Sequence, residues 1–193
     1  LHGDLLELGQ RADAIPRERH PQKRATVVVD RNVNYTNVCE SRCSFCAFYR
    51  EKGADDAYLL DHKSIFAKIE ELVQHGGTQL LMQGGLHPDL DLEYFEGLFR
   101  EIRQRFPQVQ NHSLSPAEIC HLADRHGLTV VQVLQRLQTA GLASLPGGGA
   151  EILVDEVRQA ISPKKIGWKR WGEVMLAAAG LGMTTTATMM FGS

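Results

Sequence analysis

The sequence predicts an α/β fold in which strands alternate with helices around a parallel sheet or a barrel. Short apolar runs rich in β-branched residues take turns with longer segments whose apolar residues recur at helical spacing. No linker or change of composition divides the 193 residues, of which 43% are hydrophobic. We therefore expect one core of substantial size.

The first part of the chain is expected to hold a helical extension over residues 1–25, followed by a core over residues 26–193. An amphipathic helix separates each strand of the core from the next; Gly76-Gly77 ends the first helix and Pro107 stops the second. The core begins with three predicted strands, of which the third is the weakest, at 26–35, 78–82 and 109–114.

Two capping boxes predict where the next helices begin. Ser115 and Glu118 can cap the first of them, and Thr129 and Gln132 can cap the second. The alternation then continues with a short strand, a helix and a last strand, at 143–145, around 171–179 and at 184–191.

Segments with unusual chemistry follow the predicted strands one by one. In parallel α/β folds, ligands gather where loops leave the carboxyl ends of the strands. We therefore expect five segments to face one rim: the cysteine run 39–46, Gln83-Gly84-Gly85, His112 with Ser115, the run 147–151 and the run 189–192.

Three cysteines restrict the chemistry most tightly. Cys39, Cys43 and Cys46 are spaced C-x3-C-x2-C, with Phe45 directly before the last of them. Three thiolates this close can share a soft metal centre, and a cubane iron–sulfur cluster held by three thiolates keeps one iron open.

Zinc is the alternative occupant. Structural zinc usually takes four ligands as two close pairs, whereas the remaining cysteine, Cys120, falls in a predicted helix. His87 and His112 can complete a zinc site, although neither gives a zinc-finger spacing. Three cysteines so close together cannot pair cleanly as disulfides. The spacing therefore favours a cluster and leaves zinc open.

Composition excludes some partners. The net charge of −2 gives no electrostatic reason to expect nucleic acid or an anionic membrane as a partner. No apolar run approaches the roughly 20 residues that span a bilayer. Thiols without disulfide partners are typical of a reducing compartment, so we expect a cytoplasmic protein.

The cysteine run resembles the signature of the radical S-adenosylmethionine (SAM) enzymes, with Phe45 at the aromatic position. Other segments resemble the menaquinone-pathway members that act on futalosine derivatives, and together they are most similar to the dehypoxanthine futalosine cyclases. The segments that carry this resemblance are 30–39, 46–50, 83–90, 146–153, 161–165 and 186–192.

The resemblance implies a partial TIM-type (β/α) barrel with a cofactor site at its rim. The three cysteines would hold a [4Fe–4S] cluster, and the open iron of the cluster would bind SAM. Phe45 would lie near the adenine of SAM, and the segment Gln83, Gly84 and Gly85 would receive its amino group.

The resemblance also implies a substrate and a reaction. A radical formed on the sugar of dehypoxanthine futalosine would add to the benzoate ring and close a spiro ring. His87, His112 and Glu151 are the candidates for holding the carboxylate or for accepting the released proton. An electron donor such as flavodoxin or ferredoxin is the implied partner that reduces the cluster.

Members of this family continue past the segment 189–192, usually with histidine where Ser193 stands. A complete barrel takes about 250 residues, so we expect a fragment that is truncated after about the fifth strand. Aminofutalosine synthase and the deazaflavin-forming synthases are alternative radical SAM functions. A non-catalytic iron–sulfur or zinc module and an inactive truncated chain are further alternatives.

Overall fold

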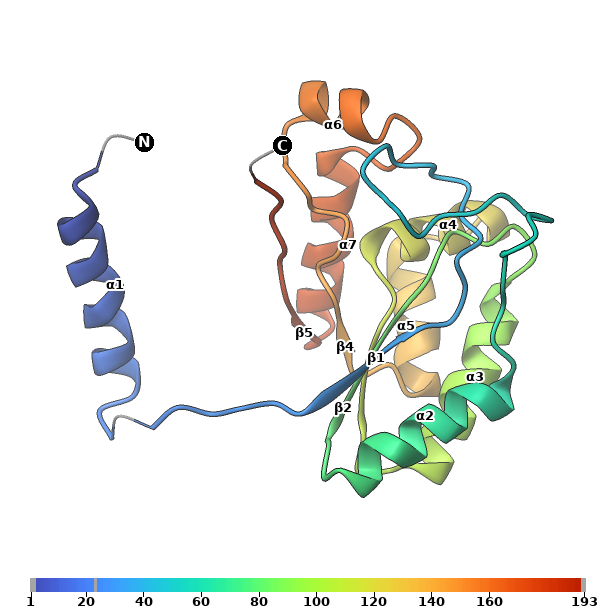
Figure 1. The fold of residues 1–193 in the computed structure, drawn as a ribbon, viewed down its shortest axis with the longest axis horizontal. Helices are drawn as coiled ribbons and strands as arrows, with labels where there is room; N and C mark the ends of the chain where they lie inside the picture. The colour runs from blue at the N-terminus through green and yellow to red at the C-terminus, as the bar shows by residue number, and fades with distance from the viewer. Residues whose placement is uncertain (1–2, 23, 192–193) are drawn as a thin grey trace.

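The computed structural model describes residues 3–22 and 24–191, and the predicted parallel α/β fold is confirmed. Five strands form one sheet in the order β1-β2-β3-β4-β5, and every neighbouring pair is parallel (Figure 1). Because all five strands run in the same direction, their carboxyl ends lie side by side at one rim. The strands are β1 (Asp30–Asn34), β2 (Gln79–Gln83), β3 (Gln110–Ser113), β4 (Ser144–Leu145) and β5 (Thr184–Thr185).

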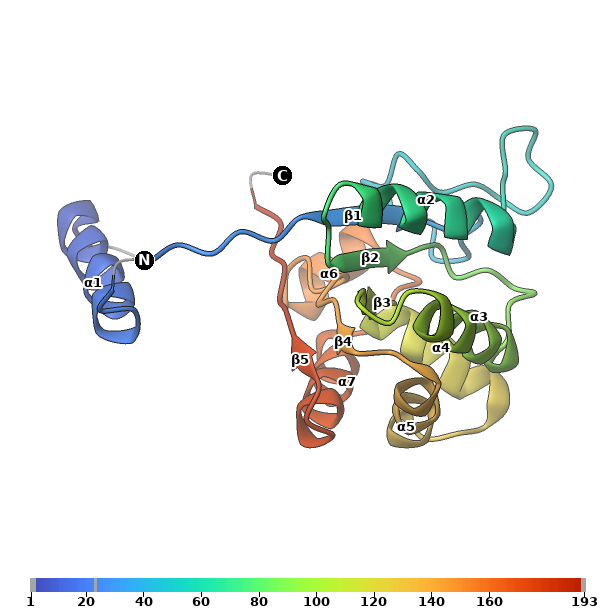
Figure 2. The same ribbon diagram turned by 90° about the horizontal axis from the view of Figure 1, so that it is seen from below.

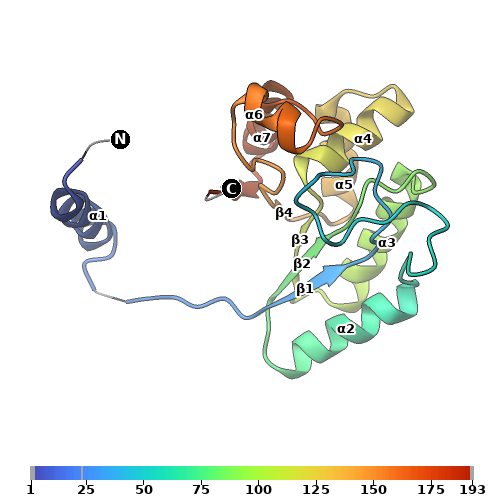
Figure 3. The same ribbon diagram turned by 45° about the horizontal axis from the view of Figure 1, so that its top comes forward.

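Helices connect the strands and pack along one face of the sheet (Figure 2). The exception is the short α6 (Asp155–Ile161), which lies over the carboxyl ends of the strands (Figure 1). In chain order they are α2 (His62–Gln74), α3 (Leu92–Arg105), α4 (Pro116–His126), α5 (Val130–Ala140), α6 (Asp155–Ile161) and α7 (Trp168–Gly180). A further helix, α1 (Leu5–Arg19), contains no buried residue and lies away from the sheet (Figure 3). Within the described ranges, no helix combines the length and the apolar character needed to cross a bilayer.

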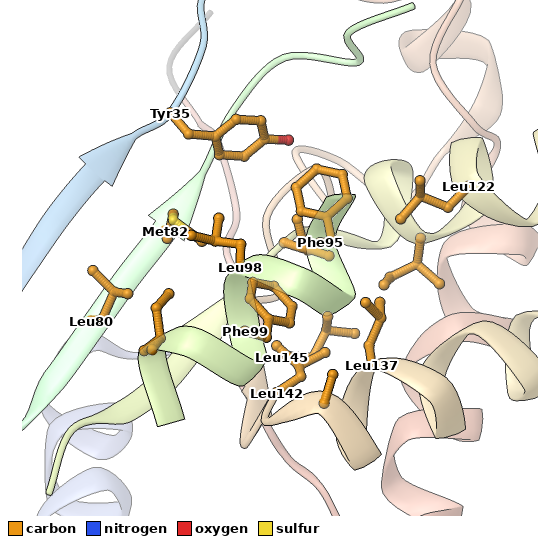
Figure 4. Close-up of a cluster of buried hydrophobic side chains, with 14 of the residues drawn as sticks. Tyr35, Leu80, Met82, Phe95, Leu98, Phe99, Leu122, Leu137, Leu142 and Leu145 are labelled. Carbon is orange, nitrogen blue, oxygen red and sulfur yellow. The ribbon is translucent and has the colours of Figure 1, made fainter. Parts of the chain in front are cut away.

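The hydrophobic core lies between the sheet and these helices. Leu80 and Met82 of β2 are fully buried, and they lie on the side of the sheet where Phe95 and Phe99 of α3 pack (Figure 4). Because side chains alternate along a strand, Gln83 lies on the other face. One face of β2 therefore builds the core, and the other face is free for polar groups.

The face of the sheet opposite the helices carries uncharged polar side chains at matched positions. The strand register places Asn32, Leu81, His112 and Ser144 in one row across the sheet, and all but Leu81 are polar. Asn34 and Gln83 pair in the next row, nearer the carboxyl rim. Hydrogen-bonding groups therefore extend down this face from the rim.

The predicted first strand is too long at its start. Residues 26–29 are exposed and form no strand, and β1 begins at Asp30, which pairs with Gln79. The valines in this segment favour a strand by propensity, but β2 does not extend far enough back to pair with them. Propensity alone therefore misplaces the start of β1.

The predicted last strand is too long at its end. β5 stops at Thr185, although the sequence predicts a strand to residue 191, and Gly192 lies outside the described residues. The neighbouring strand β4 contains only two residues because Pro146, which has no N–H to donate, follows Leu145. A short β4 offers β5 little to pair with.

Both predicted capping boxes are present. At the start of α5, Gln132 N–H donates to Thr129 Oγ1 at 3.2 Å, and Thr129 N–H donates to Gln132 Oε1 at 2.9 Å. Each box satisfies backbone N–H groups that have no partner inside the helix. The helix starts are therefore fixed by local contacts.

The cap of α5 makes a testable contribution to stability. We expect Thr129→Ala to lower the free energy of unfolding by about 1 kcal/mol, because it removes the oxygen that accepts from Gln132 N–H. Thr139→Ala, an exposed change inside the same helix, should stay within about 0.5 kcal/mol of the parent chain. Urea unfolding followed by circular dichroism measures both; equal losses would show that the cap is not the cause.

Candidate functional site

The loop after β1 carries the three cysteines across the carboxyl rim of the sheet. Its ends are joined, because Arg50 N–H donates to Asn37 O at 2.7 Å and Cys39 N–H donates to Arg50 O at 3.1 Å. Its middle is tied to the end of α6, where Ser44 N–H and Oγ both donate to Ile161 O at 2.9 Å. Protein contacts therefore hold the cysteine loop in place from two directions.

A cavity of about 310 Å³ opens beside this loop. All three cysteines line it, together with Phe45, Gln83, Gly84 and Gly85. The structure therefore brings the predicted cluster ligands and the predicted SAM-binding residues to one site. The cavity also exposes side chains that the sequence did not single out, among them Asn32, Asn34, Phe48, Tyr49, Tyr58 and Lys165.

The donor set of this site consists of soft thiols. Cys43 is buried, Cys39 and Cys46 are partly exposed, and all three are free thiols. Burial raises the pKa of Cys43, and the nearby Lys165 ammonium opposes this rise. Across residues 3–22 and 24–191, no three His, Cys, Asp or Glu side chains converge closely enough to ligate a single metal ion. Three soft thiol donors at one cavity suit an iron–sulfur cluster, whose usual protein ligands are cysteine thiolates.

Gly84 and Gly85 bring the end of β2 directly against neighbouring protein. A Cβ atom at residue 84 would lie 2.6 Å from the Tyr35 ring, and one at residue 85 would lie 2.0 Å from Val38 O. The resemblance implies that this segment receives the amino group of SAM, and the structure shows that close approach within the protein already requires glycine at both positions. The absence of side chains lets the turn rest on the cysteine loop.

This turn directs a backbone N–H at one of the predicted ligands. Leu86 N–H donates to Cys39 Sγ at 3.4 Å, and Glu40 N–H donates back to Leu86 O at 3.1 Å. Hydrogen bonds to ligand sulfurs help to set the reduction potential of iron–sulfur clusters. The local backbone therefore suits a thiolate that belongs to a cluster.

Lys165 is a charged cavity residue that the sequence did not single out. Its ammonium lies 5.8 Å from the centre of the Phe45 ring and 2.7 Å from Glu151 Oε1. Both members of this ion pair are largely buried, with side chains 15% exposed. Lys164 stands beside it in the sequence but is exposed, so the local backbone decides which lysine reaches inward.

The three predicted catalytic residues do not line the cavity. Glu151 is held by Lys165 at its edge. His87 Nδ1 accepts a hydrogen bond from Asp89 N–H at 3.1 Å, and His112 Nδ1 lies 2.7 Å from Ser144 Oγ. Both histidines are buried, and His112 belongs to the polar row below the rim. None of the three therefore lines the cavity, although Glu151 lies near enough to Cys43 for its charge to add to the rise that burial causes in the pKa of that thiol.

The buried histidines should make stability depend on pH. Burial is the main cause that lowers the pKa of His87 and of His112 below the ordinary histidine value. Between the lowered value and the ordinary one, the unfolded chain binds more protons, so the free energy of unfolding falls as the pH drops below about 6.5. We expect His112→Gln to lose less stability than the parent chain between about pH 7 and pH 5 in urea unfolding. His20→Gln, at an exposed site, should lose as much as the parent; a matching loss in His112→Gln would contradict the prediction.

Comparison with known proteins places the chain in a family. A model described as the radical SAM superfamily matches residues 33–193. The chain is 47% identical over 189 residues to cyclic dehypoxanthine futalosine synthase of Halalkalibacterium halodurans, covering 98% of this chain and 51% of that protein. It is 40% identical over 195 residues to 5-amino-6-(D-ribitylamino)uracil–L-tyrosine 4-hydroxyphenyl transferase of Trichormus variabilis, covering 98% and 50%. The chain therefore spans about half the length of these curated relatives.

Solved structures share the fold at low identity. Methylornithine synthase matches with a TM-score of 0.70 at 14% identity, over 95% of this chain and 50% of that one. The FeFe-hydrogenase maturase HydG from Carboxydothermus hydrogenoformans matches with a TM-score of 0.67 at 17% identity, over 95% and 40%. The expected partial barrel is therefore confirmed. The match over residues 33–193 shows that this chain belongs to the radical SAM superfamily, whose members use a [4Fe–4S] cluster and SAM.

Proposed function

We propose that this chain forms the cofactor-binding part of an enzyme that converts dehypoxanthine futalosine to its cyclic product in menaquinone biosynthesis. The observation that carries the proposal is the cavity, which gathers Cys39, Cys43, Cys46 and Phe45 with the turn 83–85. Similarity to cyclic dehypoxanthine futalosine synthases from two organisms, at 47% and 42% identity, supports this choice of reaction.

The proposed cofactors and the protein have different roles in the reaction. The cluster and SAM, when bound, supply the radical chemistry. The chain's part is to hold the irons through three cysteines, to orient SAM and to exclude water. Phe45 offers an aromatic face to the adenine, and backbone carbonyls of the turn 83–85 can accept hydrogen bonds from an ammonium group. A one-electron donor such as flavodoxin or ferredoxin would reduce the cluster in the cytoplasm.

The substrate would enter along the polar face of the sheet. Asn32 and Asn34 line the cavity, and His112 continues the same polar face farther from the rim. Amide groups can donate and accept, which suits the hydroxyls of a sugar. Lys165 provides a cation for a carboxylate if its bond to Glu151 is exchanged for one to the ligand. The sugar and the benzoate would thus both meet complementary groups among the residues that line the cavity.

A second candidate is the tyrosine 4-hydroxyphenyl transfer for which several relatives are named. Those relatives are 40–42% identical to this chain over nearly the same residues. Both candidate reactions would share the cofactor site and differ in what fills the polar face. The site alone therefore supports the binding of the cluster and SAM, but it does not distinguish between the substrates of the two reactions.

Product analysis separates the two reactions. The chain is reconstituted without oxygen, reduced in the presence of SAM, and supplied either with dehypoxanthine futalosine or with 5-amino-6-(D-ribitylamino)uracil and L-tyrosine. Because the chain spans about half of its relatives, the assay is repeated on a chimera that adds the remainder of the H. halodurans relative. We expect conversion of dehypoxanthine futalosine only; conversion of the uracil and tyrosine pair instead would overturn the proposal in favour of the second candidate.

A further inference from the structure

A buried carboxylate sits beneath the site and joins the ends of three strands. Glu118 of α4 is only 4% exposed. Its Oε1 accepts hydrogen bonds from Tyr35 Oη at 2.7 Å and from Gly84 N–H at 3.2 Å. Its Oε2 accepts from Ser115 N–H at 2.6 Å. One side chain therefore receives donors from the residues that follow each of the three strands.

Helix capping explains only part of this arrangement. The capping box needs the bond from Ser115 N–H to Oε2 and leaves Oε1 of Glu118 free for other donors. At the start of α5 an exposed, neutral Gln132 serves the same capping purpose. A buried carboxylate is costly unless several donors satisfy it, and burial raises the pKa of Glu118 while its hydrogen bonds oppose that rise. The bonds to β1 and β2 therefore call for a separate purpose.

Tyr35 fits the second part of the arrangement. Its ring is 1% exposed and packs edge-on against Phe95, with ring centres 5.4 Å apart (Figure 4). The same ring occupies the space where a side chain at Gly84 would lie. Its hydroxyl reaches Glu118 and also lies 3.4 Å from Gly85 O. Tyr35 thus contacts Gly84 through its ring and Gly85 through its hydroxyl. We call residues 84–86, which carry these contacts and the Leu86 N–H, the 84–86 turn.

The other side of the 84–86 turn rests on the cysteine loop. Gly85 N–H donates to Thr36 O at 3.2 Å, and Leu86 N–H donates to Cys39 Sγ at 3.4 Å. The Tyr35–Glu118 pair therefore holds one side of the turn, and the turn positions the Leu86 N–H that donates to Cys39 Sγ. Groups of this kind, which orient the surroundings of a metal ligand, commonly change metal affinity or activity 10- to 100-fold when removed.

We propose that Glu118 and Tyr35 are positioning residues that hold the 84–86 turn, and with it the Leu86 N–H, against the Cys39 sulfur. This inference rests on the proposed function in one respect, because it assigns Cys39 to a cluster. The hydrogen bond stabilises the more negative, reduced cluster more than the oxidised one, so loosening the turn lowers the reduction potential. The same loosening misplaces the backbone that would receive SAM.

Two variants and two matched controls test the proposal. Glu118→Gln keeps the size of the side chain but points an amide at a backbone donor, and Tyr35→Phe removes only the hydroxyl. Tyr35→Phe keeps the test valid if Glu118→Gln fails to fold. Tyr94→Phe removes a buried hydroxyl for which the described residues offer no hydrogen-bond partner. Glu96→Gln removes a carboxylate that pairs with Arg136 on the helical side.

Two measurements test whether Glu118 and Tyr35 hold the 84–86 turn, and one of them needs no cluster. Hydrogen exchange of the apo chain should show the amides of residues 84 and 86 exchanging about tenfold faster in both variants than in the parent or the controls. An EPR-monitored redox titration of the reconstituted chain should give a lower midpoint potential in both variants, and SAM binding about tenfold weaker. Parent-like exchange in the variants, or parent-like potential and SAM binding despite faster exchange, would overturn the proposal. If the parent chain binds no cluster, the proposed function fails, and the exchange data alone decide whether Glu118 holds the turn.

Discussion

Replacing Cys43 by alanine is expected to abolish cluster binding. Cys43 is the most buried of the three cysteines that line the cavity, so no solvent ligand can easily take its place. The parent chain, reconstituted without oxygen, should take up about four irons and four sulfides. Cys43→Ala should lose nearly all of both, together with the visible absorption of the cluster. Cys39→Ala and Cys46→Ala should behave in the same way.

Cys120→Ala is the matched control for these variants. Cys120 is fully buried in α4, away from the cavity, and burial raises its pKa to about 11, so it stays a thiol at neutral pH. Iron content in Cys120→Ala should equal that of the parent chain. Full iron content in Cys43→Ala, or loss of iron in Cys120→Ala, would show that the cluster ligands are assigned wrongly.

Gly85→Ala has the second largest expected effect. The new methyl carbon would lie 2.0 Å from Val38 O and 2.7 Å from Cys39 Cβ, and neither neighbour is the end of a flexible side chain. The turn and the cysteine loop must therefore separate. We expect the free energy of unfolding of the apo chain to fall by about 3 kcal/mol, the upper end of ordinary overpacking, and the cluster to be lost.

Gly97→Ala provides the control for this substitution. Gly97 lies inside α3, where a Cβ atom would meet nothing within 4 Å. Alanine is the better helix former, so the free energy of unfolding should rise by about 0.5–1 kcal/mol with no change in iron content. Urea unfolding and iron analysis on the two variants measure both effects. A Gly85→Ala chain as stable and as iron-rich as Gly97→Ala would contradict the close contact at residue 85.

The alternation of strands and helices could be predicted because local contacts encode it. Ser115 and Thr129 begin helices through capping groups only three residues away, so the positions of α4 and α5 are readable from the sequence. The limits of the sheet are not local in this way. The valines before Asp30 have strand propensity, yet pairing depends on where β2 begins. The end of β5 likewise depends on the shortness of β4.

The cofactor site was predictable as far as its residues follow strand ends. Cys39 and the turn 83–85 meet because β1 and β2 are parallel neighbours. Lys165 was not predictable, because its place depends on contacts between the cysteine loop and the end of α6. The capping role of Glu118 is visible in the sequence, but its bonds to β1 and β2 arise only in the folded chain.

The most direct test is the EPR spectrum of the reduced, reconstituted chain with and without SAM. The cavity that holds Cys39, Cys43 and Cys46 beside the turn 83–85 predicts a cluster with one iron that no protein thiolate holds. SAM should therefore change the spectrum of the reduced cluster. Neither buffer without SAM nor an equal concentration of a nucleoside that lacks the methionine part of SAM should change it. A cluster whose spectrum ignores SAM, or a purified chain that holds zinc and no iron after reconstitution, would contradict the radical SAM site.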